Sequence, residues 1–393
     1  MKIYLVSNRG GLSAVFQDPI YELENLIAHA CDATIIAPRT RELSKVLENV
    51  PGSSGYVARA LVRRSIGKYE PERLPKKEGP ELALAIGMAA WDLQVFEALG
   101  DYRKRFDLIA GYVFDAWGDY PSFFQNFNRV FISLPEELAL WQHHLGIVPS
   151  VIPFAADALG QAMADDPRRV DLVSYGRLPT AFLSTFLESF ARPESRHLFV
   201  RIEGRHSELH PAQPVEERLD LHYYASLQRL LRQAKASLCF DTLSPGMRKF
   251  PHSVVTLRWY EAFAAGCAAV GTRPTTSEAD RLLCWPDAHV QLPPTPRMAV
   301  EFLRAFLDDE AELARIRLRN RYYALTLHDW RLRLRDMLDL VGVSRPVGLR
   351  RELALLEEHA QIARQRAMAA GALEHERAFA AAGRAAESPA TRA

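Results

Sequence analysis

The sequence predicts an α/β protein built from two doubly wound parallel sheets. Short apolar runs alternate with amphipathic helical segments along most of the chain, a pattern typical of parallel strands joined by crossover helices. The alternation restarts near the middle of the 393 residues, a length that suits two domains and an extension. An apolar fraction of 48% supplies enough side chains for two packed cores.

The first domain is expected over residues 1–155. Its alternation predicts a sheet whose strands are parallel, because each strand is followed by a helix that returns the chain to the same end. The expected strands are Ile3–Ser7, Ala33–Ala37, Leu82–Gly87, Leu108–Phe114, Val130–Ser133 and Ser150–Phe154. The expected helices are Ile20–Cys31, Ala90–Leu99 and Pro135–Leu145.

The second domain is expected over residues 156–325, after a linker at Ala155–Arg169 that carries the turn signal Asp165-Asp166-Pro167. Its strands and helices alternate as in the first domain, so a second parallel α/β sheet is expected. The expected strands are Val170–Tyr175, His197–Ile202, Ala236–Phe240, Cys267–Val270 and Val290–Leu292. The expected helices are Thr180–Phe190, Leu221–Gln233 and Thr256–Ala265.

The rest of the chain is expected to be helical. Pro296–Val341 is a long helical region with a break near Leu327–Asp329, and residues 326–345 form the expected bridging helix. Residues 346–393 form an Ala-, Arg- and Glu-rich tail whose end, after Gly383, is expected to be disordered. Apolar positions there step by four and three, which is a narrow heptad seam for a partner helix, as in a homodimer, or for packing on the body. The seam comprises Leu349, Leu353, Leu356, Ala360, Ala363, Ala367 and Ala370.

Charge and cysteine content exclude several classes of protein. The net charge of +1 gives no electrostatic case for binding nucleic acid. The four cysteines lack C-x-x-C spacing, so we expect a reducing compartment and no metal site. The N-terminus lacks the apolar core of a signal peptide, and no apolar run reaches the length of a membrane span. We therefore expect a cytoplasmic protein without a transmembrane segment.

The most informative segment is Thr256–Gly271, with the sequence TLRWYEAFAAGCAAVG. Helical spacing is followed by Gly266, which suits the left-handed residue at a helix C-cap, and then by a small apolar strand. Glu261 is a carboxylate inside this apolar block, and such an acid needs a partner. The plain alternative is a surface helix with an Arg258–Glu261 pair at i,i+3 spacing.

This segment resembles a signature of nucleotide-sugar glycosyltransferases with the GT-B fold (group 1, family 4-like). The resemblance extends to about residue 340, where Leu327–Trp330 is similar to the closing segment of a spore-protein glycosyltransferase-like subgroup. It implies two Rossmann-like domains that face a cleft, with C-terminal helices bridging back. It also implies that Glu261 accepts hydrogen bonds from the donor ribose and that Arg258, Ala262 and Gly266 match the motif.

A second motif of that family begins the second domain at Val170–Pro179, VDLVSYGRLP. The resemblance implies that Gly176 lets the donor approach the backbone and that Arg177 faces its diphosphate. An arginine suits that role because its fork matches phosphate oxygens. The alternative is a strand that ends in a glycine turn and a surface arginine.

The pattern of that family is incomplete in two places. The lysine that often follows the arginine is missing, and Arg248 and Lys249 in the next loop are the candidate substitutes, unless that loop is simply solvated. Eight residues before Glu261, where retaining members carry a first glutamate, stands Ser253. Ser253 is therefore a donor-side candidate, it or Thr256 is the candidate N-cap of the helix, and the stereochemical outcome stays open.

The first domain holds the candidates for acceptor activation. Asp115 and then Asp119 follow an expected strand, and either carboxylate could take the proton of an acceptor hydroxyl or simply cap a turn. Gly10, Gly11 and Asp18 lie in or after the first loop, which resembles the acceptor-side loop of the family. That loop does not have the G-x-G-x-x-G spacing of a dinucleotide site.

No metal-binding spacing and no D-x-D motif in a suitable loop are present. We therefore expect no cofactor and a metal-independent enzyme. Arginines between Arg315 and Arg335 make the closing helices basic, which suits either a solvated face or peripheral contact with an anionic membrane.

The sequence thus predicts transfer of a sugar from a nucleoside-diphosphate donor, a UDP- or GDP-sugar, to the hydroxyl of a glycan, glycolipid or small molecule, as in polysaccharide biosynthesis. Two alternatives come from other classes: an isomerase that acts on a nucleotide sugar without an acceptor, and a non-catalytic scaffold on the same fold.

Overall fold

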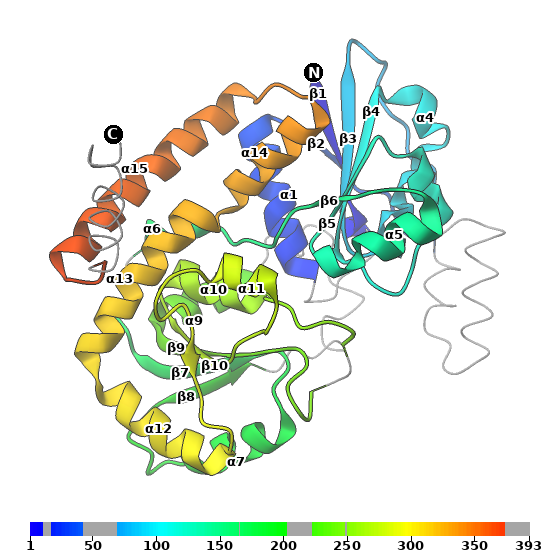
Figure 1. The fold of residues 1–393 in the computed structure, drawn as a ribbon. Coiled ribbons are helices and arrows are strands. Elements are labelled where there is room, and N and C mark those ends of the chain that lie inside the picture. The colour runs from blue at the N-terminus through cyan, green and yellow to red at the C-terminus, as the bar shows by residue number, and fades with distance from the viewer. Residues whose placement is uncertain (11–16, 42–68, 165, 203–221, 248–249, 374–393) are drawn as a thin grey trace, which may run out of the picture. The chain divides into compact units, whose positions relative to one another are not determined.

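The computed structural model describes residues 1–10, 17–41, 69–164, 166–202, 222–247 and 250–373. The chain divides into two compact units (Figure 1). Unit 1 takes the described residues of Met1–Pro153, Gly204–Ala225 and Arg333–Glu352. Unit 2 takes those of Phe154–Glu203, Ser226–Leu332 and Leu353–Ala393.

Unit 1 is built on a parallel sheet with the strand order β2-β1-β3-β4-β5-β6. The central strands are buried on both faces, which explains their nearly continuous apolar sequences. The strands are β1 (Lys2–Val6), β2 (Thr34–Ile36), β3 (Glu81–Ala89), β4 (Leu108–Asp115), β5 (Arg129–Ile132) and β6 (Ser150–Val151).

Helices and aromatic side chains complete the core of unit 1. Helix α1 buries Ile20, Leu23 and Ile27 on one face, in agreement with its amphipathic sequence. Trp141 is fully buried, and its indole NH donates to the carbonyl of Ala116. The helical elements are η1 (Asn8–Gly10), α1 (Asp18–Cys31), η3 (Ala90–Leu99), α4 (Tyr102–Arg105), η4 (Ser122–Asn126), η5 (Pro135–Glu137) and α5 (Leu138–Leu145).

Unit 2 has a parallel sheet with the order β11-β10-β9-β7-β8. Helices lie on both faces of this sheet (Figure 1), so its small apolar strands are buried. The strands are β7 (Val170–Tyr175), β8 (Phe199–Ile202), β9 (Ala234–Phe240), β10 (Ala268–Thr272) and β11 (Val290–Gln291). The helices before the C-terminal series are α6 (Ala158–Ala162), α7 (Thr180–Phe190), α9 (His222–Gln233), α10 (Leu257–Ala265) and α11 (Ser277–Leu282).

The predicted α/β class with two Rossmann-like, doubly wound sheets is confirmed. Most expected elements are found within a few residues of their predicted bounds. Ala90–Leu99 differs, because it forms a 3-10 helix rather than an α-helix. The expected linker also differs, because it contains the short helix α6, whose first turn is capped by Asp157 accepting from the amide of Gly160 at 2.9 Å.

The long helical region is broken twice. Its helices are α12 (Pro296–Asp308), α13 (Glu310–Leu327) and α14 (Trp330–Val341). Asp309 accounts for the unpredicted break, because its side chain accepts from the amide of Glu312 and caps α13. The predicted break at Leu327–Asp329 is confirmed.

Asp329 holds that second break. Its fully buried carboxylate accepts from the amides of Leu159 at 3.0 Å and Arg331 at 2.8 Å, and from the guanidinium of Arg331 at 3.2 Å. Burial raises the pKa of Asp329, and the charge of Arg331 opposes that rise. The buried acid is therefore satisfied from three directions.

The tail begins as helix α15 (Val347–Ala369). Leu349, Leu356, Ala360 and Ala367 are buried in the chain itself. The last turns pack through Ala367 and Leu373 on Leu318, Tyr322 and Tyr323 of α13. Packing on the body therefore accounts for these seam positions, although the end after Gly383 lies outside the described residues. No helix within the described ranges combines the length and hydropathy needed to cross a membrane.

The close packing of β10 on β9 at Gly271 yields a first prediction. A Cβ atom at Gly271 would overlap the carbonyl oxygen of Cys239 on the neighbouring strand β9. We therefore expect Gly271→Ala to lower the free energy of unfolding of unit 2 by about 3 kcal/mol, because the strands cannot separate without losing ladder bonds. Urea unfolding followed by tryptophan fluorescence measures this change. Gly79→Ala is the control, because open space surrounds Gly79, and a similar loss in both variants would contradict the explanation.

Candidate functional site

The strand order places a topological switch point in unit 2 between β7 and β9. The chain leaves β7 towards β8 on one side and continues from β9 towards β10 on the other. In open α/β sheets, ligands bind outside the carboxyl ends of the strands at such a point. Tyr175 ends β7, and Asp241 directly follows β9. Both residues therefore lie at the carboxyl edge of the sheet, where a ligand is expected.

Glu261 lies on α10 at this edge and is only 3% exposed. The hydroxyl of Tyr175 donates to Glu261 Oε2 at 2.7 Å. Tyr175 is therefore the hydrogen-bond partner that we expected for an acid in an apolar segment. Burial and the neighbouring carboxylate raise the pKa of Tyr175 well above its usual value, so its hydroxyl stays protonated and remains a donor. The alternative of a surface Arg258–Glu261 pair is wrong for Glu261, because this side chain is buried.

Arg258 supports the turn that follows β7. Its guanidinium donates to the carbonyl of Arg177 at 2.5 Å, and its stem lies 3.7 Å from the place of a Cβ at Gly176. Gly176 has φ = +68°, a left-handed conformation that glycine adopts without strain. The turn therefore carries Arg177, whose side chain is exposed, two residues after Tyr175 at the end of β7.

Ser253 belongs to a buried polar cluster at the same edge. Its hydroxyl donates to Asp241 Oδ1 at 2.8 Å and accepts from the amide of Thr275 at 3.1 Å. The hydroxyl of Thr242 also contacts Asp241, and the hydroxyls of Ser244 and Thr272 lie 2.6 Å apart. The sequence analysis did not single out Asp241 or Thr272, although a polar residue at or directly after the end of a buried strand was the available signal.

The predicted side-chain cap of α10 is wrong. Thr256 occupies the N-cap position but its side chain makes no capping bond, and Ser253 is engaged with Asp241 instead. The Thr256 hydroxyl oxygen is buried and has no hydrogen-bond partner among the described residues. The start of α10 therefore retains an unsatisfied polar atom close to the switch point. Arg248 and Lys249 lie outside the described residues.

Unit 1 brings its candidates to the corresponding edge of its own sheet. Asp115 ends β4 and pairs in register with Ala89, the last residue of β3. The amide of Ala89 donates to Asp92 Oδ2 at 3.0 Å, which adds a second carboxylate that the sequence analysis missed. Asp119 lies four residues beyond Asp115 and is exposed.

The loop after β1 reaches the same edge. The side-chain Nδ2 of Asn8 donates to the backbone carbonyl of Asp92 at 2.7 Å, and Asn8 Oδ1 accepts from the hydroxyl of Tyr69 at 2.6 Å. A Cβ at Gly10 would overlap the carbonyl oxygens of Ala37 and Pro38, so this glycine is required by backbone packing. Gly11 lies outside the described residues.

A buried ion pair fixes this loop on α1. Arg9 Nε lies 2.7 Å from Glu24 Oε2, and the same oxygen accepts from Ser7 at 2.7 Å. Arg9 also donates to Asn25 and to the carbonyl of Tyr21. Burial raises the pKa of Glu24 and the charge of Arg9 opposes that rise. Asp18, in the first turn of α1, has its pKa raised by burial to about 7.

Nothing in the described part of the chain gathers three or more His, Cys, Asp or Glu side chains into a group that could hold a metal ion.

The pKa of Asp18 generates a second prediction. Because this acid binds its proton more tightly when folded, the folded state loses stability as pH rises from about 4 to about 7. We therefore expect Asp18→Asn to be more stable than the wild type at pH 8, by about 1–2 kcal/mol after allowance for the exposed part of the side chain, and equal to it near pH 4. Denaturant melts across this range measure the difference, with the exposed Asp119→Asn as control. A difference that stays constant with pH would contradict the assignment.

Comparisons with known proteins complete the description. Residues 186–339 match the family model described as glycosyl transferase-like, whereas no curated protein matches the chain. Among solved structures, Anabaena HepE in complex with UDP-glucose is 11% identical with a TM-score of 0.47, over 87% of this chain and 99% of that one. WaaG, a glycosyltransferase involved in lipopolysaccharide biosynthesis, is 11% identical with a TM-score of 0.42, over 87% and 100%.

S. aureus TarM in complex with UDP is 9% identical with a TM-score of 0.41, over 66% of this chain, which spans 55% of the TarM length. At these scores the likenesses are distant, and the description of the fold rests on the two sheets themselves. The family match is the specific finding, and it covers residues 186–339, which are similar to the glycosyl transferase-like family.

Proposed function

We propose that this protein transfers a sugar from a nucleoside-diphosphate sugar to an acceptor hydroxyl. The observation that carries the proposal is the buried Glu261, held by Tyr175 at the switch point of a domain that matches a glycosyl transferase-like family. The complexes of HepE with UDP-glucose and of TarM with UDP make UDP the first nucleotide to try, with GDP next.

On the donor side, Glu261 would accept hydrogen bonds from the ribose hydroxyls. Tyr175 donates to Glu261 Oε2 and so helps to hold the carboxylate in place at the switch point. The unsatisfied hydroxyl of Thr256 and the amides at the start of α10 would add donors beside it. Arg177, with Arg248 or Lys249, would stabilise the diphosphate as it gains charge, so that the reaction would not depend on a metal.

On the acceptor side, Asp115 would accept the proton of the attacking hydroxyl. The new bond joins the acceptor oxygen to the anomeric carbon, while the bond from that carbon to the phosphate oxygen breaks and the nucleoside diphosphate leaves. Asp119 is the second candidate for this base, and Asp18 and Gly10 belong to the proposed acceptor loop. The pKa of Asp18, about 7, also suits proton transfer near neutral pH.

A third prediction tests the donor side. We expect Glu261→Gln to weaken UDP binding by about tenfold or more, because hydrogen bonds to a charged acceptor are worth about 1.5–3 kcal/mol. Calorimetry with UDP, GDP and dTDP, without metal and with EDTA, measures the affinities. Glu301→Gln is the matched control, because Glu301 is exposed on α12. Equal affinity in all three proteins would contradict the role of Glu261.

A fourth prediction tests the acceptor side. We expect Asp115→Asn to lower kcat by about 10²–10⁴-fold, the usual contribution of a general base, and to leave the affinity for the nucleoside diphosphate unchanged. Release of nucleoside diphosphate from sugar donors that carry the nucleotide identified by calorimetry measures kcat, and Asp119→Asn is assayed beside Asp115→Asn. Loss of activity in Asp119→Asn alone would transfer the role to Asp119. A change of configuration in the donor without acceptor, seen by NMR, would instead indicate an isomerase.

A further inference from the structure

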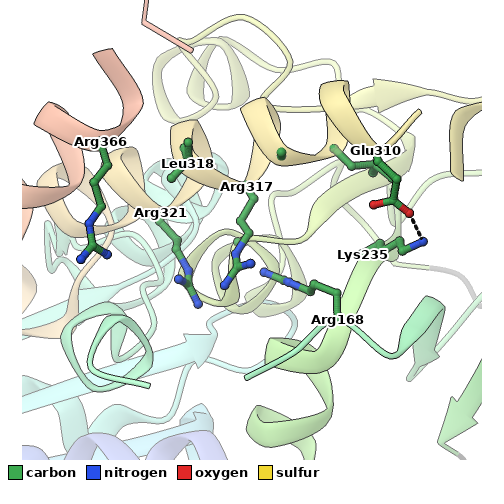
Figure 2. Close-up of a pocket in the computed structure, with 10 residues that line it drawn as sticks. Arg168, Lys235, Glu310, Arg317, Leu318, Arg321 and Arg366 are labelled. Atoms are coloured by element: carbon green, nitrogen blue, oxygen red, sulfur yellow. Dashed lines mark hydrogen bonds and ion pairs between the residues drawn. The ribbon is translucent and has the colours of Figure 1, made fainter. Parts of the chain in front are cut away.

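The basic hollow beside α13 (Figure 2) is engaged by the chain itself. Arg168 donates to the carbonyl of Ala265, the last residue of α10, at 2.6 Å. Arg321 donates to the carbonyl of Ala164 at 3.4 Å, and Lys235 pairs with two carboxylates. These cations therefore serve the fold of unit 2. A further ligand is better accommodated where a buried polar atom lacks such a partner.

The carboxyl edge of the sheet in unit 1 contains such an atom. Gln17, the residue before α1, is only 2% exposed, and its Oε1 has no hydrogen-bond partner among the described residues. Its Nε2 lies 3.4 Å from Asp92 Oδ2, so the amide lies beside the partly exposed carboxylate of Asp92. A buried oxygen without a donor is costly. A ligand that brings hydroxyl groups to Asp92 would supply the missing donor.

Close packing of η3 on the sheet sets the position of Asp92. A Cβ atom at Gly87 of β3 would overlap the Cβ of Asp92 and the side chain of Leu93, so the glycine allows η3 to lie directly on the strand. The bond from the amide of Ala89 then holds the carboxylate of Asp92 over the end of β3. Because Ala89 pairs in register with Asp115 of β4, the two acids lie at the ends of neighbouring strands.

Aromatic side chains follow the ends of the same two strands. Trp91 precedes Asp92 and packs edge-to-face on Phe123 of η4, with ring centroids 6.0 Å apart. Trp117 follows β4 by two residues and is 38% exposed. An exposed aromatic surface beside a few polar groups is typical of a ligand site. This edge therefore offers both an apolar surface and hydrogen-bond acceptors.

We propose that this edge of unit 1 binds a saccharide, which would be the acceptor if the proposed transferase function holds. A pyranose ring carries hydroxyl donors around its rim and C–H groups on its face. The rim suits Asp92 and Gln17 Oε1, which accept hydrogen bonds, and the C–H face suits the electron-rich face of the Trp117 indole. A lipid or an aromatic alcohol would bring too few hydroxyl groups for these oxygens.

The fifth prediction concerns methyl glycosides added to the full-length protein without a sugar donor and followed by saturation-transfer difference NMR. We expect saturable binding of cyclic glycosides. The affinity should fall about tenfold in Asp92→Asn and Gln17→Met, which each lose an acceptor oxygen, and about threefold or more in Trp117→Leu. Asparagine retains an oxygen for the amide of Ala89, so Asp92→Asn tests binding with little risk to folding. The probes are methyl α-glucoside, methyl β-galactoside and methyl α-mannoside, with glycerol as an acyclic triol.

Two control variants lie outside the proposed site. Glu97→Gln removes an exposed carboxylate near the other end of η3, and Val148→Ala shortens an apolar side chain that is 65% exposed before β6. We expect both controls to bind glycosides as the wild type does, and an equal loss in the controls would overturn the proposal.

The glycoside titration and the transfer reaction can fail separately. Absence of saturable binding to all three glycosides would overturn the saccharide site, as would equal binding of glycerol, because the ring would then not be recognised. Transfer to glycerol without glycoside binding would overturn this site and leave the transferase intact. Glycoside binding without nucleotide binding would support the site and contradict the transferase.

Discussion

The hydrogen bond from Tyr175 to Glu261 is the contact on which the organisation of the candidate site depends. It satisfies a carboxylate inside a helix whose other residues from Trp259 to Ala265 are all buried. A buried acid without a partner would be costly. The hydrogen bond therefore favours one position of α10 relative to the end of β7. The same contact aligns the left-handed turn at Gly176 with the start of α10.

Unit 1 also contains a buried carboxylate near its candidate site, Glu24, whose partners are different residues. Its first loop is held by the buried pair Arg9–Glu24, which Ser7 and Asn25 support. Such a pair adds little net stability compared with apolar packing, but removal of one partner is costly. The loop is therefore fixed at the carboxyl edge, where Asn8, which follows β1, donates to the backbone carbonyl of Asp92, which follows β3.

The sequence was sufficient to predict the two parallel sheets, because buried parallel strands are short apolar runs and their crossover helices are amphipathic. It indicated that Glu261 lies within an apolar block but left a surface pair with Arg258 as an alternative, and the hydrogen bond from Tyr175 decides between the two. It was not sufficient for Asp241, Asp92 or Tyr69, whose partners lie in distant segments that only the tertiary structure brings together. The capping role expected for Ser253 was wrong for the same reason, because Asp241 competes successfully for its hydroxyl.

The break at His328–Asp329 has a consequence for the continuity of the C-terminal helices. An uninterrupted helix from Glu310 to Val341 would be a rod about 48 Å long, at 1.5 Å per residue. The buried carboxylate of Asp329, bonded to the amides of Leu159 and Arg331, ends one helix and starts the next. A single acid thus interrupts what would otherwise be one continuous helix, and its bond to the amide of Leu159 ties the interruption to the first residues of unit 2.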